Sequence, residues 1–436
     1  MRILGESKGI QILGDIHTMN KILLEGPILS RSGYGEHARL VFESIKNTKG
    51  LQVFISPLEW GRTSWNYPDA SIIEGINRYS LYIEECKRRD VNPEFDMQIH
   101  VGIPNEFQKK AKYSVCVTAG IETDRVSPDW LIKTHQGIDK IIVPSHHSKK
   151  GFIETNYHIQ NKSENTTAEL KCACPISVVG YPVKEPTATA PLTIDFETDY
   201  NFLTIALLGP RKNLEFTIRG FIDEFRENSN VGLILKTAIS KSSIMDRKNT
   251  KAQLENFVNS LGEKKCKIYL LHGNLTEPEI HSLYTHPKVK AYVSTSHGEG
   301  YGLPLFEAAY SGLPVIATDW SGHLDFLSGT HKGKEKKLFA KISYDLKQVQ
   351  SAAVWDNIIT KDSKWAMPNE ISYKSQLSKV YSNYGMYKKW AETLKSEICD
   401  RFSKDSILLQ MREALDITSE DEVDSEIESM FASLSE

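Results

Sequence analysis

The sequence predicts an α/β protein built from two Rossmann-like domains that face each other across a cleft. The chain has 436 residues, which is too long for one ordinary hydrophobic core and suits two domains. Short apolar segments typical of buried strands alternate with segments typical of helices in both halves of the chain. Each half also has a glycine-containing loop between a strand and a helix, at 30–37 and at 298–302. Together these observations favour a two-domain α/β architecture.

Composition and charge exclude several classes of protein. Hydrophobic residues make up 40% of the chain and charged residues 25%, as in ordinary soluble globular proteins. The formal net charge is −3, so no overall basic field attracts nucleic acid. No apolar run approaches the roughly 18 residues that a membrane span needs, and the N-terminus lacks the apolar core of a signal peptide. With six scattered cysteines, we expect a cytoplasmic protein with reduced thiols.

The N-terminal half begins with a strand, a glycine loop and a helix. Residues 1–20 show no assignable pattern, whereas 21–29 is predicted to be a strand and 38–46 an amphipathic helix. Between them, Gly33 and Gly35 allow the loop to approach an anion at the helix start. The alternative is a tight turn whose glycines serve packing alone.

Further strands and helices alternate up to the end of the first domain, which is expected to span 1–183. The strand at 113–118 leads into a loop at 119–125 that carries Glu122. Aromatic and polar residues interleave in another loop at 59–67, a composition that suits a carbohydrate surface, a lid or base stacking. The other predicted elements are strands at 51–57, 95–101 and 139–145 and helices at 71–89 and 128–136.

A linker and a basic pair mark the start of the second half. Residues 184–200 contain many threonines with prolines nearby and are predicted to be the interdomain linker. The second domain, 201–400, opens with a strand. Arg211 and Lys212 come directly after this strand and before a helix, where they can meet a diphosphate as charge-assisted donors. The alternative is two solvated surface charges.

The rest of the second half continues the alternation and ends in helices. Helical patterning covers 369–416, and the tail at 419–436 has seven acidic residues and no basic ones. The other predicted elements are strands at 201–208, 231–237 and 267–272 and helices at 214–227 and from 274 onwards.

The stretch 294–326 carries the clearest chemical signal. A short apolar strand at 289–293 leads into a loop with three glycines between 298 and 302. Pro304 suits the first turn of the following helix, which is expected to end near Gly312. The free N–H groups and the positive dipole end of such a helix start favour a phosphate.

Two carboxylates bracket this helix start, Glu299 in the loop and Glu307 on the helix. An ionised carboxylate accepts hydrogen bonds and can take two sugar or ribose hydroxyls at once. With a diphosphate held by the helix start, the unit suits a nucleotide sugar. The alternative is an ordinary strand–turn–helix unit with one surface glutamate and one helix glutamate.

Glu299 and Glu307 form a Glu-x7-Glu pair within Glu-Gly-Tyr-Gly-Leu-Pro-Leu-Phe-Glu-Ala. This stretch closely resembles the donor motif of the retaining, glycogen-synthase-like glycosyltransferases with the GT-B fold, the glycosyl transferases group 1. The resemblance is clearest over 200–330 and extends to 110–183. It implies an enzyme that moves a sugar from a nucleotide-diphosphate sugar to a hydroxyl acceptor with retention at the anomeric carbon.

The resemblance also implies roles for individual residues. Glu299 orients the transferred sugar, and Arg211 and Lys212 neutralise the departing diphosphate. Glu122 lies in the loop that presents residues to the acceptor, where many members of the family have a histidine. Glu307 takes the ribose hydroxyls. The further donor-binding residues are expected to be Gly33, Gly35, Asn274, Leu275, Gly300, Tyr301, Gly302 and Leu303.

No metal and no cofactor besides the donor are expected. The chain has no Asp-x-Asp, which fits the metal-independent habit of GT-B enzymes. In such enzymes the last helix crosses back to the first domain, which suggests this role for 401–418. The acceptor could be a glycan, a lipid, a small molecule or modified DNA. The protein could also form a homo-oligomer.

Three other functions remain as alternatives. A GT-B-fold nucleotide-sugar epimerase or a glycan phosphorylase shares the two-domain architecture. A transferase that glycosylates hydroxymethylated bases in DNA would need a local basic cleft, for which Lys109, Lys110, Lys112, Lys149 and Lys150 are candidates. A non-catalytic sugar- or nucleotide-binding module is the third.

Overall fold

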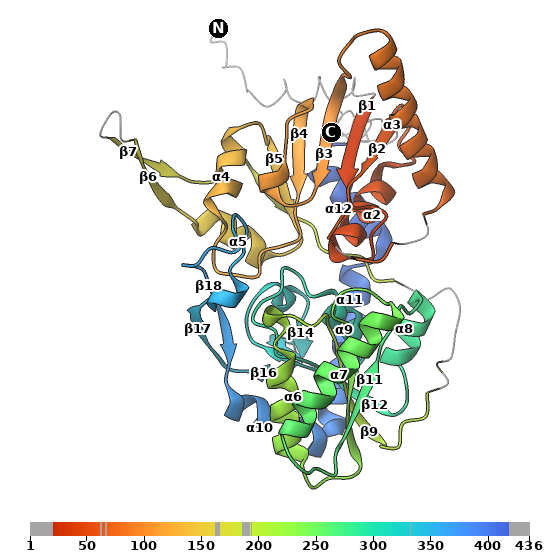
Figure 1. The fold of residues 1–436 in the computed structure, drawn as a ribbon, viewed down its shortest axis with the longest axis vertical. Helices are drawn as coiled ribbons and strands as arrows, with labels where there is room; N and C mark the ends of the chain where they lie inside the picture. Colours follow the sequence, from red (N-terminus) through yellow and green to blue (C-terminus); the bar gives the residue numbers. More distant parts are fainter. Residues whose placement is uncertain are drawn as a thin grey trace, which may run out of the picture.

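The computed structural model describes residues 21–417 apart from positions 62, 66–67, 162–165, 185–191, 193 and 332. Within these residues the chain forms two α/β domains, one above the other in Figure 1. The predicted fold class is therefore confirmed. The predictions for residues 1–20, for the acidic tail and for linker positions 185–191 and 193 fall outside the described residues.

The N-terminal domain is built on a six-stranded parallel sheet with the order β2-β1-β3-β4-β5-β8. Its inner strands are largely buried, as expected for a sheet with helices on both faces. The strands are β1 (Lys21–Gly26), β2 (Gln52–Pro57), β3 (Phe95–Val101), β4 (Ala111–Val117), β5 (Lys140–Val143) and β8 (Ile176–Val178). The helices are α2 (Gly33–Ile45), α3 (Ala70–Arg88), η1 (Pro104–Glu106), α4 (Pro128–His135) and α5 (His146–Glu154).

The C-terminal domain repeats the architecture with a different strand order, β11-β10-β9-β12-β13-β16, again all parallel. The strands are β9 (Tyr200–Ile205), β10 (Val231–Lys236), β11 (Lys267–Leu271), β12 (Val289–Ser294), β13 (Val315–Thr318) and β16 (Ala340–Ile342). The helices up to the last strand are η2 (Pro210–Lys212), α6 (Leu214–Phe225), α7 (Ile244–Ser260), α8 (Glu277–Tyr284), α9 (Leu303–Tyr310) and η3 (Gly322–Asp325).

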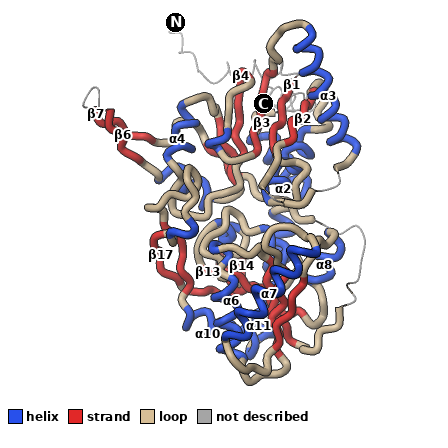
Figure 2. Tube along the Cα trace, in the orientation of Figure 1, coloured by secondary structure: helices blue, strands red, loops and turns tan. Residues whose placement is uncertain are grey.

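Three antiparallel hairpins branch from the two sheets and were not predicted (Figure 2). They are β6 (Tyr157–Asn161) with β7 (Thr166–Leu170), β14 (Ser328–His331) with β15 (Lys334–Lys337), and β17 (Tyr344–Gln348) with β18 (Lys364–Pro368). The first projects from the N-terminal domain (Figure 1, left). The last contains the short helix η4 (Ser351–Ala353) between its strands.

The predicted helical region at 369–416 consists of three helices, α10 (Glu370–Ser382), α11 (Tyr384–Arg401) and α12 (Lys404–Ala414). Helix α12 lies against α2 of the other domain, so the blue end of the chain sits among the orange elements in Figure 1. Just after α12, the Asp416 carboxylate accepts hydrogen bonds from Tyr113 Oη at 2.8 Å and from Lys140 Nζ at 2.8 Å. The C-terminal segment therefore ties the two domains together.

Helix α7 was missed because its sequence carries little periodicity. Its buried apolar side chains are Leu254 and Val258, while Ile244 and Met245 at its start are exposed. An amphipathic pattern needs apolar residues on one face over several turns, and here they occupy only the last two.

Candidate active site

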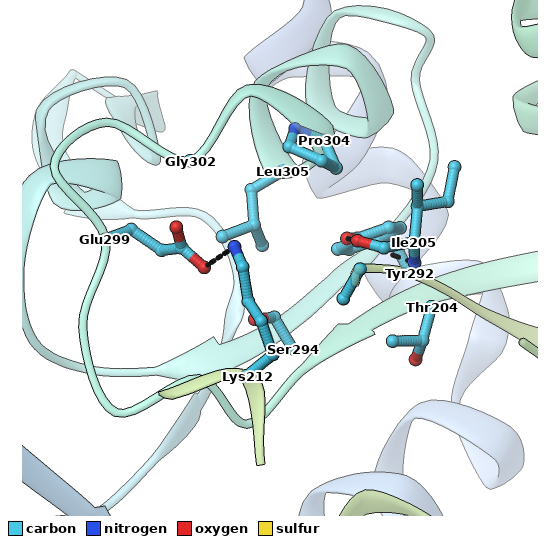
Figure 3. A pocket seen from close by; sticks show the side chains of 10 residues that line it. Thr204, Ile205, Lys212, Tyr292, Ser294, Glu299, Gly302, Pro304 and Leu305 are labelled. Atoms are coloured by element: carbon cyan, nitrogen blue, oxygen red, sulfur yellow. Dashed lines mark hydrogen bonds and ion pairs between the residues drawn. The ribbon is translucent and has the colours of Figure 1, made fainter. Parts of the chain in front are cut away.

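The C-terminal sheet has a topological switch point between β9 and β12. Strands β10 and β11 lie on one side of β9, whereas β12, β13 and β16 continue on the other. At such a point the loops leaving the carboxyl ends of neighbouring strands diverge and form a crevice that binds ligands. A pocket lies there (Figure 3), lined by Thr204, Ile205, Ala206, Lys212, Tyr292, Ser294, Glu299, Gly302, Pro304 and Leu305.

One carboxylate and two cations border this pocket. Glu299 Oε1 accepts a hydrogen bond from Lys212 Nζ at 2.5 Å, and Oε2 accepts one from Arg211 Nη1 at 2.9 Å. Glu299 is only 6% exposed. Burial by itself opposes its ionisation, but Lys212 and Arg211 outweigh this effect and lower the pKa of Glu299 to about 2. Glu299 is therefore ionised at neutral pH.

The two cations differ in their electrostatic environment. Burial and the neighbouring Arg211 guanidinium lower the pKa of Lys212, whereas the Glu299 carboxylate acts to raise it. Burial also acts against the charge of Arg211, but Glu122 and Glu299 raise its pKa. Both side chains come from η2, directly after β9, so the sheet edge presents two positive charges at the switch point.

A strained residue holds the Glu299 backbone in place. Ser321 has φ +90°, a conformation that is uncommon for a residue with a side chain. Its hydroxyl accepts a hydrogen bond from the Glu299 N–H at 2.9 Å. No local sequence pattern indicates this role for Ser321, because Glu299 lies 22 residues earlier in the chain.

Glu122 reaches this ion cluster from the N-terminal domain. Its Oε1 lies 3.5 Å from Arg211 Nη2, so the two domains contribute opposite charges to one site. The backbones also touch. A Cβ atom on Gly298 would overlap the carbonyl oxygen of Glu122, and one on Gly300 would overlap that of Ala119. These two glycines are therefore required for the close approach of the domain loops.

Helix α5 of the N-terminal domain adds hydrogen bonds to the same loop. Ser145 Oγ donates to the Gly300 carbonyl at 2.6 Å. One residue later, the His146 N–H donates to the Asp325 carboxylate at 2.7 Å. The residues at the start of this helix therefore contact the loops of the other domain.

The first glycine loop faces the start of α9 across the cleft. A Cβ atom on Gly33 would have ordinary contact with only one described side chain, Leu303, at 4.0 Å. By contrast, a Cβ on Gly35, in the first turn of α2, would overlap the Ser30 carbonyl oxygen, so Gly35 is required for the close packing of this turn on the preceding loop. Gly302 begins α9 with φ +93°, a conformation that favours glycine.

Glu307 lies on α9, is half-buried, and is bound by a tyrosine that no sequence pattern indicated. Tyr284 Oη donates to Glu307 Oε2 at 2.9 Å. Burial raises the pKa of Glu307 to about 7, although Lys184 acts in the opposite direction. The two predicted glutamates therefore have opposite pKa shifts, because only Glu299 touches two cations.

The remaining predicted donor residues lie at different depths. Asn274 is exposed and accepts a hydrogen bond from Ser242 Oγ at 2.6 Å. The Leu275 carbonyl accepts one from Arg31 Nη1 of the other domain at 3.4 Å. Tyr301 is 4% exposed and its ring packs on Tyr181 at 5.0 Å, within the apolar contact between the domains. A ligand contact from Tyr301 would therefore come from its backbone.

The matching family model is described as glycosyl transferases group 1 and covers residues 195–334, the segment that carries this pocket, the basic pair and both glutamates. This segment belongs to the group 1 glycosyl transferases.

Curated relatives are similar to less than half of the chain. The serotype-specific mannosyltransferase WbdA of Escherichia coli is 25% identical over 206 residues, which is 46% of this chain and 23% of that protein. The probable sucrose-phosphate synthase 3 of Arabidopsis thaliana is 25% identical over 195 residues, 42% of this chain and 18% of that protein. The matches thus span about a quarter or less of each relative's length.

Solved structures extend the likeness of fold to both domains. Sucrose-phosphate synthase from Thermosynechococcus elongatus superposes with a TM-score of 0.57 at 11% identity, covering 90% of this chain and 98% of the other. HepE from Anabaena, in complex with UDP and glucose, gives a TM-score of 0.54 at 12% identity, covering 91% and 99%. The chain therefore has the GT-B fold, with the group 1 segment in the second domain.

Among the residues that the structure describes, no group of three or more His, Cys, Asp or Glu side chains is arranged to hold a metal ion. Over the same described ranges, no helix is long and apolar enough to cross a membrane.

Proposed function

We propose that the protein is a retaining glycosyltransferase that moves a sugar from a nucleotide-diphosphate sugar to a hydroxyl acceptor. The observation that carries this proposal is the buried Glu299 carboxylate held between Arg211 and Lys212 at the switch point of a group 1 segment. The WbdA and sucrose-phosphate synthase relatives support the same class of reaction.

Each part of the site has a task in this reaction. Arg211, Lys212 and the start of α9 attract the diphosphate, because cations and free helix N–H groups stabilise phosphate oxygens. Glu299 orients the sugar, and Glu307 takes the ribose hydroxyls. The base lies along 273–275, where Asn274 is exposed.

The chemical step exchanges one bond at the anomeric carbon for another. The bond to the diphosphate oxygen breaks with its electron pair, and the acceptor oxygen bonds to the same carbon from the same face, which retains the configuration. The acceptor proton passes to the departing diphosphate. Negative charge grows on that diphosphate in the transition state, so preorganised positive charge is the main contribution of the protein. We propose that the step needs neither a metal ion nor a cofactor.

We also place this activity in the cytoplasm. All six cysteines lie within the described residues as thiols rather than disulfides, and three of them are buried. Free, mostly structural thiols are typical of a reducing compartment.

A panel of UDP-, GDP-, ADP- and TDP-sugars tests the proposal through nucleotide release, with and without acceptors. We expect release from one donor, accelerated by one class of acceptor, and retention of configuration in the product by NMR. Product analysis separates a transferase from an epimerase or a phosphorylase. Absence of both donor binding and nucleotide release across the panel would refute the proposal.

The pKa of Glu307 predicts how donor affinity depends on pH. Only the ionised carboxylate accepts two ribose hydroxyls, and its pKa is raised to about 7 in the free protein. Donor affinity should therefore rise between about pH 6 and pH 8 and level off above this range. Isothermal titration calorimetry with the donor identified by the panel measures this pH dependence of donor affinity. The donor itself does not contribute to it, because a diphosphate esterified at both ends does not titrate between about pH 6 and pH 8.

A pair of variants assigns this pH dependence to Glu307. Glu307→Gln should bind the donor more weakly at high pH and lose the slope. Glu255→Gln, at an exposed carboxylate on α7 paired with Lys251, should keep the wild-type slope. An unchanged slope in Glu307→Gln would remove Glu307 from the ribose site.

A further inference from the structure

A two-stranded segment connects the C-terminal domain with the N-terminal domain beside the cleft. We call residues 344–368 the arm; it comprises β17, η4 and β18 and lies between β16 and α10. The family match ends at residue 334, so the arm lies outside it. Figure 1 shows β18 next to α5 of the N-terminal domain.

The base of the arm is fixed to the loop that carries Glu299. The Ala366 N–H donates to the His297 carbonyl at 3.0 Å, and His297 Nδ1 lies 2.7 Å from the Ala366 carbonyl oxygen. The Trp365 ring, which is fully buried, stacks on the His297 ring at 4.8 Å. In addition, η4 contacts η2, the turn of Arg211 and Lys212.

The far part of the arm is fixed to the loop that carries Glu122. The Asp124 N–H donates to the Lys364 carbonyl at 2.9 Å, and the Lys364 N–H donates back to Asp124 Oδ1 at 2.7 Å. Arg125 Nη1 donates to Asp362 Oδ2 at 2.8 Å. Trp130 Nε1 of α4 donates to the Asn357 carbonyl at 3.0 Å. The arm therefore spans both loops that meet at the ion cluster.

A second pocket lies between the arm and the N-terminal domain. Apolar side chains form its walls, and Glu122 and Arg125 bring charge to it. The lining residues are Gly120, Ile121, Glu122, Thr123, Arg125, Val126, Trp130, Ile358 and Ile359. Glu122 lines this pocket and also lies 3.5 Å from Arg211, so the pocket is adjacent to the donor site.

We propose that this second pocket binds the acceptor, that the acceptor is a saccharide, and that the arm determines acceptor specificity. This inference rests on the proposed transferase function. A sugar ring offers C–H faces to the half-buried Ile358 and Ile359 and hydroxyls to Glu122 and Arg125. A lipid chain in the same place would bury these two charged groups against hydrocarbon, which is unfavourable.

An exposed tryptophan of the arm is paired through its backbone with Ile359, which lines the pocket. Trp355 is 60% exposed, and its backbone forms a tight pair with Ile359, whose N–H donates to the Trp355 carbonyl at 2.8 Å. An exposed aromatic ring at the rim of a pocket is suited to pack on the next unit of a saccharide. Because Trp355 is exposed, its side chain can be removed without creating a cavity in the hydrophobic core, which makes it the suitable residue for testing acceptor specificity.

The charges of the N-terminal domain favour a saccharide over nucleic acid. Four of the five lysines that could form a basic cleft are paired with carboxylates: Lys109 with Asp139, Lys110 with Glu25, Lys112 with Asp96 and Lys150 with Glu154. Paired lysines provide little net positive field for a phosphate backbone.

The test measures transfer from the active donor to three classes of acceptor probe. These are a set of methyl glycosides and disaccharides, a long-chain alcohol in detergent, and an oligonucleotide with hydroxymethylated cytosine. We expect a saccharide alone to accelerate nucleotide release. With that saccharide, Trp355→Ala should raise the acceptor KM about tenfold, as the loss of an aromatic contact does, and leave kcat within about twofold.

Leu346→Ala provides the matched control, because Leu346 is an exposed apolar residue of the same arm, on β17 away from the pocket. It should keep the wild-type KM. Ile358→Trp, which fills the pocket, should abolish transfer to the saccharide while the thermal midpoint stays near that of Leu346→Ala.

The outcomes separate this inference from the proposed function. Nucleotide release that only the alcohol or the oligonucleotide accelerates, or that no probe accelerates, overturns the saccharide pocket and leaves a transferase. The same acceptor KM in Trp355→Ala and Leu346→Ala overturns the role of the arm. If no donor binds and none is turned over, the proposed function itself fails.

Discussion

Arg211→Gln is expected to lower kcat for sugar transfer by about 10²–10³-fold, the usual effect of removing one preorganised group that stabilises developing negative charge. Arg211 contacts Glu299, Glu122 and the Gly298 carbonyl, so its charge is fixed in place before the diphosphate begins to leave. Because the stabilised charge grows during the step, kcat should fall more than donor affinity.

Steady-state kinetics with the donor from the panel, together with thermal unfolding, check this expectation. Arg219→Gln is the control, since Arg219 is exposed on α6 of the same domain and lies over the Phe257 ring. It should retain wild-type turnover. Wild-type kcat in Arg211→Gln with an intact fold would contradict the assignment of Arg211.

Glu299→Gln is expected to destabilise the protein as well as to inactivate it. The substitution leaves Arg211 and Lys212 adjacent without their shared carboxylate, and removing one partner of a buried ion pair costs about 3–5 kcal/mol. The pKa of Glu299 falls from its ordinary value of 4.5 to about 2, which corresponds to a contribution of about 3 kcal/mol at neutral pH.

The pH dependence of this contribution has a definite sign. A carboxyl whose pKa is lowered by folding stabilises the folded state above its unfolded pKa, and the contribution is lost as pH falls from about 4.5 towards 2. Urea unfolding at neutral pH and near pH 3 should therefore show a larger acid loss in the wild type than in Glu299→Gln. Glu227→Gln, at an exposed carboxylate paired with Lys265, should behave like the wild type. Equal acid losses in Glu299→Gln and the wild type would contradict the buried ion pair.

Local patterns predicted the parts of the site that are contiguous in sequence. Arg211 and Lys212 follow an apolar strand, and Glu299 and Glu307 flank a glycine loop and a helix start, so strand–loop–helix reasoning places each pair at the carboxyl edge of a sheet. The sequence could not show that Glu299 sits between the two cations, because 87 positions separate Lys212 from Glu299 and only the parallel pairing of β9 with β12 brings them together.

What the sequence did not reveal depends on contacts between distant segments. Ser321 and Tyr284 each hold a predicted glutamate, yet serine and tyrosine occur in every kind of environment and gave no local signal. The arm has short strands and exposed apolar side chains such as Leu346, so its hydrophobic pattern resembles that of an ordinary surface loop. Its position follows from hydrogen bonds to Asp124 and His297, which lie in different domains.

The contact between Glu122 and Arg211 makes the charge of the donor site depend on how far the domains are apart. With the domain loops together, as here, two cations face two carboxylates. If the N-terminal domain swings away, Glu122 leaves with it and the two cations face Glu299 alone. The separated form is then the more strongly anion-attracting one, suited to capture a donor from solution. Closure balances that surplus, because Glu122 then adds a second carboxylate beside the two cations.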